Sequence, residues 1–277
     1  MAEITAAAVN DLRKKTGLPM MDVKKALHDA AGNEEEAIRL LRERGLKILG
    51  SRSDRETSFG RFGLYVGLSS STGAMVELKC ESAPVAANEE FIQLANDLAR
   101  QLATGPGAAT GDELLDQPSP SKPGMTLRQQ KDDLFNRIRE VFNVGRLVRL
   151  DGPCGGYSHN ATTVSGVLLQ VEGGNDAAAK DVCMHVAAMR PVGLNKEDVP
   201  AADVERERSI LRETALKEGK PANIVDKIVD GQLRNFYAER VLTEQPFVKE
   251  NKQSVGQFAA QNGMKLVKFV HWELGKE

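Results

Sequence analysis

Histidine is the side chain best suited to acid–base and metal chemistry near neutral pH, and this chain has four of them. They are spread along the sequence, at His28, His159, His185 and His271. Because they form no HxxxH or His-x-Asp pair, each is expected to be a surface residue of a helix or strand rather than a ligand. The sequence also has no GxxxxGK[ST], no GxGxxG after a strand and no GxSxG, which argues against phosphate cradling and a serine nucleophile.

The cysteines give no sign of a reactive or metal-binding site either. Cys80, Cys154 and Cys183 are odd in number, widely spaced and without a CxxC, which argues against a zinc ribbon or a disulfide framework and favours a reducing compartment. Cys80 ends an apolar strand, so it is expected to be a small buried residue. A binding protein is therefore favoured over an enzyme, with no metal and no cofactor.

Two exposed features could carry binding. Residues 81–86 lie between a buried strand and a capped helix, which is where rigid scaffolds present functional loops. A plain strand-to-helix turn, with Pro84 fixing φ, explains the same residues. Met20 and Met21 stand at a helix start and could be an adaptable contact or core residues. From the residues alone, both alternatives stay open in each case.

Composition excludes several classes of function. The 277 residues carry 37 Lys and Arg against 39 Asp and Glu, a net charge of −2, which argues against direct nucleic-acid binding. Aromatic residues make up only 5%, so base-stacking platforms are not expected. No run of about 18 apolar residues is present, and the first five residues lack the features of a signal peptide. These features predict a cytoplasmic protein of two to four compact units that does not bind membranes.

The elements that must position these residues begin with three short helices in residues 1–50. Thr5 and Asn33 are candidate N-caps, and the helices are expected to end at Gly17, Gly32 and Gly45. So small a unit has little room for a catalytic cleft, which favours a binding module. The polar residues 51–61 are predicted to be a linker.

Residues 62–277 are predicted to form an α+β core with antiparallel sheets. A strand hairpin followed by a helix occurs at 62–102 and again at 146–189, which suggests a weak internal duplication. The predicted subdomains are 62–142, including a loop at 104–124 and a helix from Leu127 to about Phe142, and 143–277.

The second subdomain contains an expected antiparallel helical hairpin at 203–240, broken at 219–221. Its buried positions are expected to be Val204, Leu211, Ala215, Ile224, Ile228 and Phe236. Ser254 is predicted to cap a short helix, and residues 266–274 a final strand.

Several segments resemble one protein family. They are 16–22 (Thr-Gly-Leu-Pro-Met-Met-Asp), 24–27 (Lys-Lys-Ala-Leu), 76–81, 88–91, 185–188, 218–221 and 245–248. In this order they are similar to elongation factor Ts, the guanine-nucleotide exchange factor of the GTPase elongation factor Tu. The resemblance covers about four-fifths of the chain and is weakest at 104–125.

The resemblance implies a ubiquitin-associated-like domain at 1–50, the two-subdomain core and a protruding helical hairpin arm. It also implies a role in protein biosynthesis: binding elongation factor Tu with GDP and promoting GDP release without covalent chemistry. Arg13, Met20 and Met21 would contact the G domain of elongation factor Tu, and His159 its third domain. A homodimer is left open.

The resemblance further implies that the loop after the Cys80 strand enters the G domain and disturbs its magnesium and phosphate region. The family motif there is typically Thr-Asp-Phe-Val, whereas this chain has Ser82, Ala83, Pro84 and Val85. A wedge without the Phe ring would act through its backbone and Pro84 packing. Between His159 and the next strand, relatives usually carry Gly and Arg, but residues 160–166 hold no basic side chain.

Two other interpretations remain at this stage. One is a divergent paralogue that binds elongation factor Tu without efficient exchange, which the altered residues 82–85 keep open. The other is an adaptor that uses the helices of residues 1–50 and never contacts a GTPase.

Overall fold

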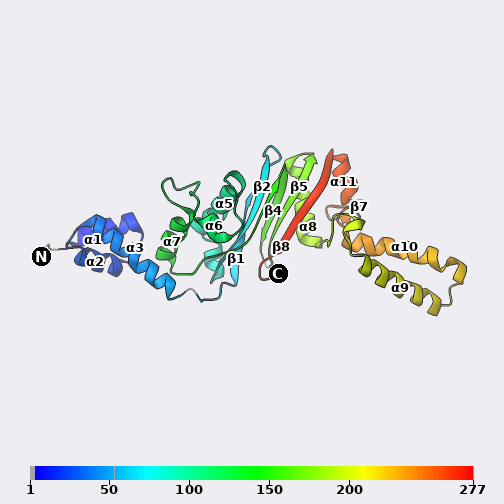
Figure 1. The fold of residues 1–277 in the computed structure, drawn as a ribbon, viewed down its shortest axis with the longest axis horizontal. Helices are drawn as coiled ribbons and strands as arrows, with labels where there is room; N and C mark the ends of the chain where they lie inside the picture. The colour runs from blue at the N-terminus through cyan, green and yellow to red at the C-terminus, as the bar shows by residue number, and fades with distance from the viewer. Residues whose placement is uncertain (1–3, 53, 162, 277) are drawn as a thin grey trace. The chain divides into compact units, whose positions relative to one another are not determined.

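The computed structural model describes residues 4–52, 54–161 and 163–276, so the predicted domain limits at residues 1 and 277 and linker residue 53 lie outside it. The fold is α+β, as the sequence predicted (Figure 1). The described residues form two compact units. The first comprises Met1–Leu64, Ala74–Arg149 and Leu274–Lys276, and the second comprises Tyr65–Gly73 and Leu150–Glu273.

The first unit begins with three helices, α1 (Ala6–Thr16), α2 (Met20–Asp29) and α3 (Glu34–Gly50). The Thr5 and Asn33 side chains cap α1 and α3 as predicted, and Gly17 ends α1 in the left-handed region at φ 67°. The three helices share a small core, made of Val9, Leu12, Leu18, Val23, Ala26, Leu27, Ala30, Ala37 and Leu41.

Two of the predicted helix ends were wrong. Helix α2 ends at Asp29, before the turn that contains Gly32. Helix α3 continues through Gly45 to Gly50. Gly45 is buried because a neighbouring side chain occupies its missing Cβ position: a Cβ there would lie 1.6 Å from Oδ1 of Asn136. This glycine serves close packing rather than helix termination.

The sheet of the first unit has the order β1-β2-β3, formed by Phe59–Tyr65, Thr72–Cys80 and Asn143–Asp151. Strand β1 therefore starts inside the predicted linker. Four helices accompany this sheet: α4 (Ala83–Ala86), α5 (Glu89–Thr104), α6 (Gly111–Leu115) and α7 (Leu127–Ile138). The predicted 104–124 loop thus contains α6, which the sequence reading missed.

Helix α7 ends four residues before the predicted Phe142. Arg139 terminates it in the left-handed region at φ 67°, and its backbone N–H donates to the Phe135 carbonyl. Phe142 instead lies fully buried just before β3 and packs edge-on against Phe91 of α5.

The sheet of the second unit has the order β4-β5-β8, from Cys154–Asn160, Val164–Gly173 and Met264–Glu273. Both of its pairings are antiparallel, and β8, drawn in red, returns from the end of the chain to lie beside β5 (Figure 1). The start of the predicted hairpin-plus-helix unit at 146–189 was therefore too early, because residues 146–151 belong to β3 of the first sheet.

Helix α8 (Asp176–Met189) packs on β4 and β5, with Val182 and Val186 buried, whereas Met189 at its end is 43% exposed. The remaining short elements are η1 (Lys196–Asp198), β6 (Pro246–Phe247), β7 (Glu250–Ser254) and α11 (Val255–Gln261). Ser254 caps α11 in a capping box with Gln257, which agrees with the prediction for that residue.

Helices α9 (Ala201–Lys217) and α10 (Ala222–Arg240) run antiparallel, because Arg208 pairs with Asp230 while Arg212 pairs with Asp226. On α10 the prediction of a buried Phe236 is confirmed, but the predicted burial of Ile224 and Ile228 is wrong by one residue. Val225 and Val229 are buried, whereas Ile224 is 39% exposed. Among the described residues, no helix combines the length and apolar character needed to cross a membrane.

Candidate partner-binding site

Residues 81–88, called here the 81–88 connection, join the central strand β2 to helix α5. Ser82 is extended and precedes α4, a single helical turn that Pro84 suits because the first amides of a helix have no internal partner. The side chains of Ala83 and Pro84 are exposed, whereas Val85 is only 9% exposed and enters the core. The predicted binding residues therefore divide into an exposed tip and a buried anchor.

Hydrogen bonds hold the base of this connection. The Glu81 carboxylate accepts from the Val141 backbone N–H at 2.8 Å and from the Arg55 guanidinium at 2.9 Å. The Ser82 hydroxyl donates to Oε1 of Glu140 at 2.7 Å. Partial burial would raise the pKa of Glu81, but the two donors outweigh it and hold the pKa below its ordinary value. The exposed tip thus stands on a fixed base.

A cysteine, Cys80, directly precedes the connection. The nearest thiol, Cys80, is fully buried, and burial raises its pKa to about 12, so it is protonated and inert near neutral pH. Within residues 4–52, 54–161 and 163–276, no group of three or more His, Cys, Asp or Glu side chains could hold a metal ion. The groups exposed at the tip are the backbone and the small apolar side chains of Ala83 and Pro84.

The other predicted binding residues of the first unit lie on its N-terminal helices. Met20 and Met21 begin α2 and are 48% and 71% exposed, so they are surface residues rather than core residues. Arg13, in the last turn of α1, is also exposed. Exposed methionines form a soft apolar surface that can adapt to a partner.

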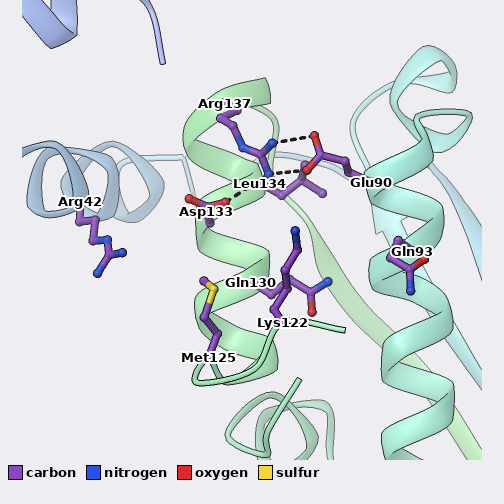
Figure 2. A pocket seen from close by; sticks show the side chains of 9 residues that line it. All are labelled: Arg42, Glu90, Gln93, Lys122, Met125, Gln130, Asp133, Leu134 and Arg137. Atoms are coloured by element: carbon purple, nitrogen blue, oxygen red, sulfur yellow. Dashed lines mark hydrogen bonds and ion pairs between the residues drawn. The ribbon is translucent and has the colours of Figure 1, made fainter. Parts of the chain in front are cut away.

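The C-terminal turn of α7 lies between these two groups of residues. A hollow of about 180 Å³ lies beside it. Figure 2 shows the Arg137 guanidinium reaching Glu90 of α5 and Asp133 of α7. The two ion pairs measure 2.6 Å and 3.2 Å. The pair with Glu90 ties the end of α7 to the start of α5, the helix that the 81–88 connection leads into, and the pair with Asp133 lies within α7.

Sequence reasoning missed the residues that follow this turn. Arg139 pairs with Asp22 of α2 at 2.7 Å, and its carbonyl accepts from Arg52 at 2.6 Å. Glu140 holds Ser82, as described above. The only local signal was the end of α7, and the sequence placed that end too late.

His159, the remaining predicted site residue, lies in the second unit on β4. Its Nδ1 is 2.9 Å from the Tyr157 hydroxyl, and the ring is half-buried. His185 contradicts the prediction of a surface residue, because it is fully buried on α8 with Nε2 2.9 Å from Oε1 of Gln245. Its Nδ1 accepts from the Val248 N–H, so its role is to join α8 to the segment before β7.

Comparison with known proteins gives consistent matches. A family model described as elongation factor Ts matches residues 81–276. An elongation factor Ts from Methylococcus capsulatus is 37% identical over 276 residues, covering 99% of this chain and 92% of the relative. The elongation factor Ts of Aquifex aeolicus is 40% identical over 280 residues and covers 96% of each chain. That of Deinococcus radiodurans is 40% identical over 271 residues, covering 97% of this chain and 98% of the relative.

Proposed function

The chain belongs to the elongation factor Ts family, and we propose that it is the guanine-nucleotide exchange factor of the GTPase elongation factor Tu. In this role it binds elongation factor Tu with GDP, promotes GDP release and allows GTP to enter, during translation elongation in the cytoplasm. It supplies no covalent chemistry.

Exchange of this kind is a difference in binding free energy. The factor must bind the nucleotide-free GTPase better than the loaded one, and by linkage the nucleotide then weakens binding of the factor by the same amount. Each ~1.4 kcal/mol of this difference weakens nucleotide binding about tenfold. The Mg²⁺ of a GTPase needs near-ideal octahedral geometry, so a small displacement of its surroundings lowers nucleotide affinity strongly.

The observation that carries the proposal is the exposed Ala83–Pro84 tip on its fixed base. Because Val85, Glu81 and Ser82 hold it, the tip is rigid enough to displace groups of a partner that it contacts. A Phe side chain would bury about 150–250 Å², and Ala and Pro bury much less. We therefore assign the wedge to the backbone of α4 and the Pro84 ring. Val85 anchors the wedge from the core side.

The remaining assignments follow from family membership and exposure. We propose that α1–α3 form a ubiquitin-associated-like domain whose exposed Arg13, Met20 and Met21 contact the G domain of elongation factor Tu. We propose that His159 contacts its third domain. The division into a domain at 1–50, two core subdomains and the helical arm at 203–240 is a proposal. The linker predicted at 51–61 is shorter, because β1 begins at Phe59, and the boundary predicted at 142/143 lies later, because β3 (Asn143–Asp151) belongs to the first sheet.

Labelled GDP released from elongation factor Tu in a stopped-flow instrument tests the wedge. Pro84→Gly should lower the saturating release rate by about three- to tenfold, because a flexible tip no longer transmits strain, a change of roughly 1 kcal/mol. Val85→Ala should lower it similarly by loosening the anchor. Pro123→Gly, at another exposed proline of the first unit, is the matched control and should leave the rate unchanged.

Unchanged rates in both Pro84→Gly and Val85→Ala would move the wedge to another surface. The altered residues 82–85 favour one competing function, a paralogue that binds without exchange. In that case the wild-type chain would bind elongation factor Tu but leave GDP release at its spontaneous rate, and Ala83→Asp with Pro84→Phe would create exchange activity. An adaptor would not bind elongation factor Tu, whereas an exchange factor would still bind it in a pulldown after deletion of residues 1–50.

A further inference from the structure

The last turn of α7 and the residues after it contact both proposed binding surfaces of the first unit. On one side are the three N-terminal helices that carry Arg13, Met20 and Met21, called here the N-terminal surface. On the other side is the 81–88 connection. Residues far apart in the sequence thus meet at one short segment, 136–141, called here the α7 joint.

Each N-terminal helix contacts the α7 joint. For α1, the missing Cβ of Gly17 would lie 3.0 Å from Cδ of Arg137. For α3, the missing Cβ of Gly45 would overlap the side chain of Asn136. For α2, Asp22 pairs with the Arg139 guanidinium at 2.7 Å, one residue beyond the exposed Met21. The contact at Gly45 needs glycine, because a side chain there would collide with Asn136. Gly17, the C-cap of α1, suits glycine because its φ is 67°.

The 81–88 connection is tied to the next residues of the same joint. Glu140 accepts from the Ser82 hydroxyl, and the Val141 N–H donates to Glu81. Two consecutive residues, Arg139 and Glu140, therefore face opposite ways: one holds α2 and the other holds the connection. Arg137 fixes the base of the joint through Glu90 and Asp133 (Figure 2).

The backbone of Arg139 is unusual for such a residue. It has φ 67°, a conformation usually taken by glycine at the end of a helix. A glycine there would end α7 equally well, but it would lose the ion pair with Asp22. The left-handed turn also redirects the chain, so that Glu140 and Val141 reach the connection.

We propose that Arg139 and Glu140 are positioning residues, which hold the N-terminal surface and the 81–88 connection at a fixed separation. This inference rests on the exchange function proposed above. Binding energy gained on the N-terminal surface drives the wedge into the GTPase only if the link between them is stiff. A loose joint leaves both surfaces able to bind and uncouples them. The saturating rate of release then falls, while the concentration needed for half-saturation changes little.

The test is stopped-flow GDP release from elongation factor Tu over a range of concentrations of the full chain. Arg139→Asn, which tolerates the left-handed backbone, and Glu140→Ala should each lower the saturating rate about three- to tenfold, roughly the loss of one partly buried ion pair or charged hydrogen bond. The half-saturating concentration should change less than about twofold. The double variant should be no slower than the slower single variant, because either change breaks the same link.

Conservative variants and a control separate positioning from general damage. Arg139→Lys and Glu140→Gln keep the charge or the acceptor and should restore most of the rate. Glu34→Gln removes the Lys15–Glu34 ion pair, which joins α1 to α3 and includes no residue of the joint, and should behave as wild type. Thermal unfolding shows whether Arg139→Asn folds. If it does not, the comparison of the saturating rates of Glu140→Ala and Glu140→Gln tests the proposal by itself.

Wild-type saturating rates in folded Arg139→Asn and Glu140→Ala would overturn the inference and leave the exchange function intact. Losses that multiply in the double variant would also overturn it. Spontaneous release rates with the wild-type chain would instead overturn the exchange function, and this inference with it.

Discussion

The two three-stranded sheets of the described residues each contain a hairpin followed by a helix, and a comparison of the two shows where they differ. In the first, β1 and β2 lead to α5; in the second, β4 and β5 lead to α8. In each, a glycine of the first strand lies against an alanine of the following helix. These pairs are Gly63 with Ala95, and Gly155 with Ala179. The close approach of strand to helix is common to both units.

The difference lies in the link between the central strand and the helix. In the second unit, only Gly174 and Asn175 separate β5 from α8, and Asn175 caps the helix. In the first unit, residues 81–88 separate β2 from α5 and include the exposed turn α4. The proposed function therefore resides where the two units differ, and the shared framework supplies rigidity.

The largest expected effect tests the shared framework. A Cβ at Gly63 would lie 1.9 Å from the Ala95 carbonyl oxygen, whereas a Cβ at Gly155 would lie 2.6 Å from the Ala179 Cβ. Gly63→Ala should lower the free energy of unfolding by about 3 kcal/mol, and Gly155→Ala should lower it by about 1 to 2 kcal/mol. The first loss is larger because the new Cβ meets backbone, which relieves overpacking less easily than a side chain does. Ala179→Gly should rescue Gly155→Ala, but Ala95→Gly should not rescue Gly63→Ala.

Each half of this prediction has its own readout. Trp272, the one tryptophan of the sequence, lies on β8, so its fluorescence in urea follows the second unit. Amide hydrogen exchange in α5 follows the first. Equal rescue at both positions would mean that the two strand–helix contacts are equivalent after all.

The next effect concerns the links themselves. Gly174 has φ 81°, and a Cβ there would also meet the Met264 Cβ at 2.7 Å. Gly174→Ala should therefore destabilise the second unit by about 2 kcal/mol. In the first unit, Ala83→Gly lies in an exposed turn and should cost no more than about 1 kcal/mol. Urea unfolding measures both, and an equal cost would remove the contrast between a tight link and a tolerant one.

The elements that the sequence predicts well are those decided locally. Thr5, Asn33 and Ser254 all cap helices as predicted, because a cap needs only the next three residues. The exposure of Met20 and Met21 was left open by the sequence, and the structure resolves it. Positions decided by distant contacts were mispredicted. Gly45 was predicted to end α3 but instead packs against Asn136, and the first buried positions of α10 were misplaced because its packing on α9 selects them.

The candidate site divides along the same line. The 81–88 connection stands out in the sequence, since it follows an apolar strand and precedes a capped helix. Arg139 does not, because its partner Asp22 is 117 residues away and its left-handed cap lacks the glycine that marks such caps. The contacts that would make the loop effective are thus harder to predict than the loop.

The smallest effect uses the buried polar residues of the two helices. Asp97 of α5 accepts from Gln93 and Gln130, whereas His185 of α8 meets Gln245 and Val248. Burial lowers the pKa of His185 from its ordinary value of 6.5, and the Gln245 contact only partly opposes this. Below about pH 6.5 the unfolded chain therefore binds a proton that the folded chain resists, so stability falls as pH falls.

This loss should be confined to the second unit. From pH 7 to pH 5, the urea midpoint followed by Trp272 should fall, and His185→Gln, which keeps a donor toward Gln245, should lower the midpoint at pH 7 but flatten its dependence on pH. His28, exposed on α2, gives the matched control, because His28→Gln should leave the slope as in wild type. A slope that survives in His185→Gln would assign the acid sensitivity to carboxylates, and the two helices would then respond to pH alike.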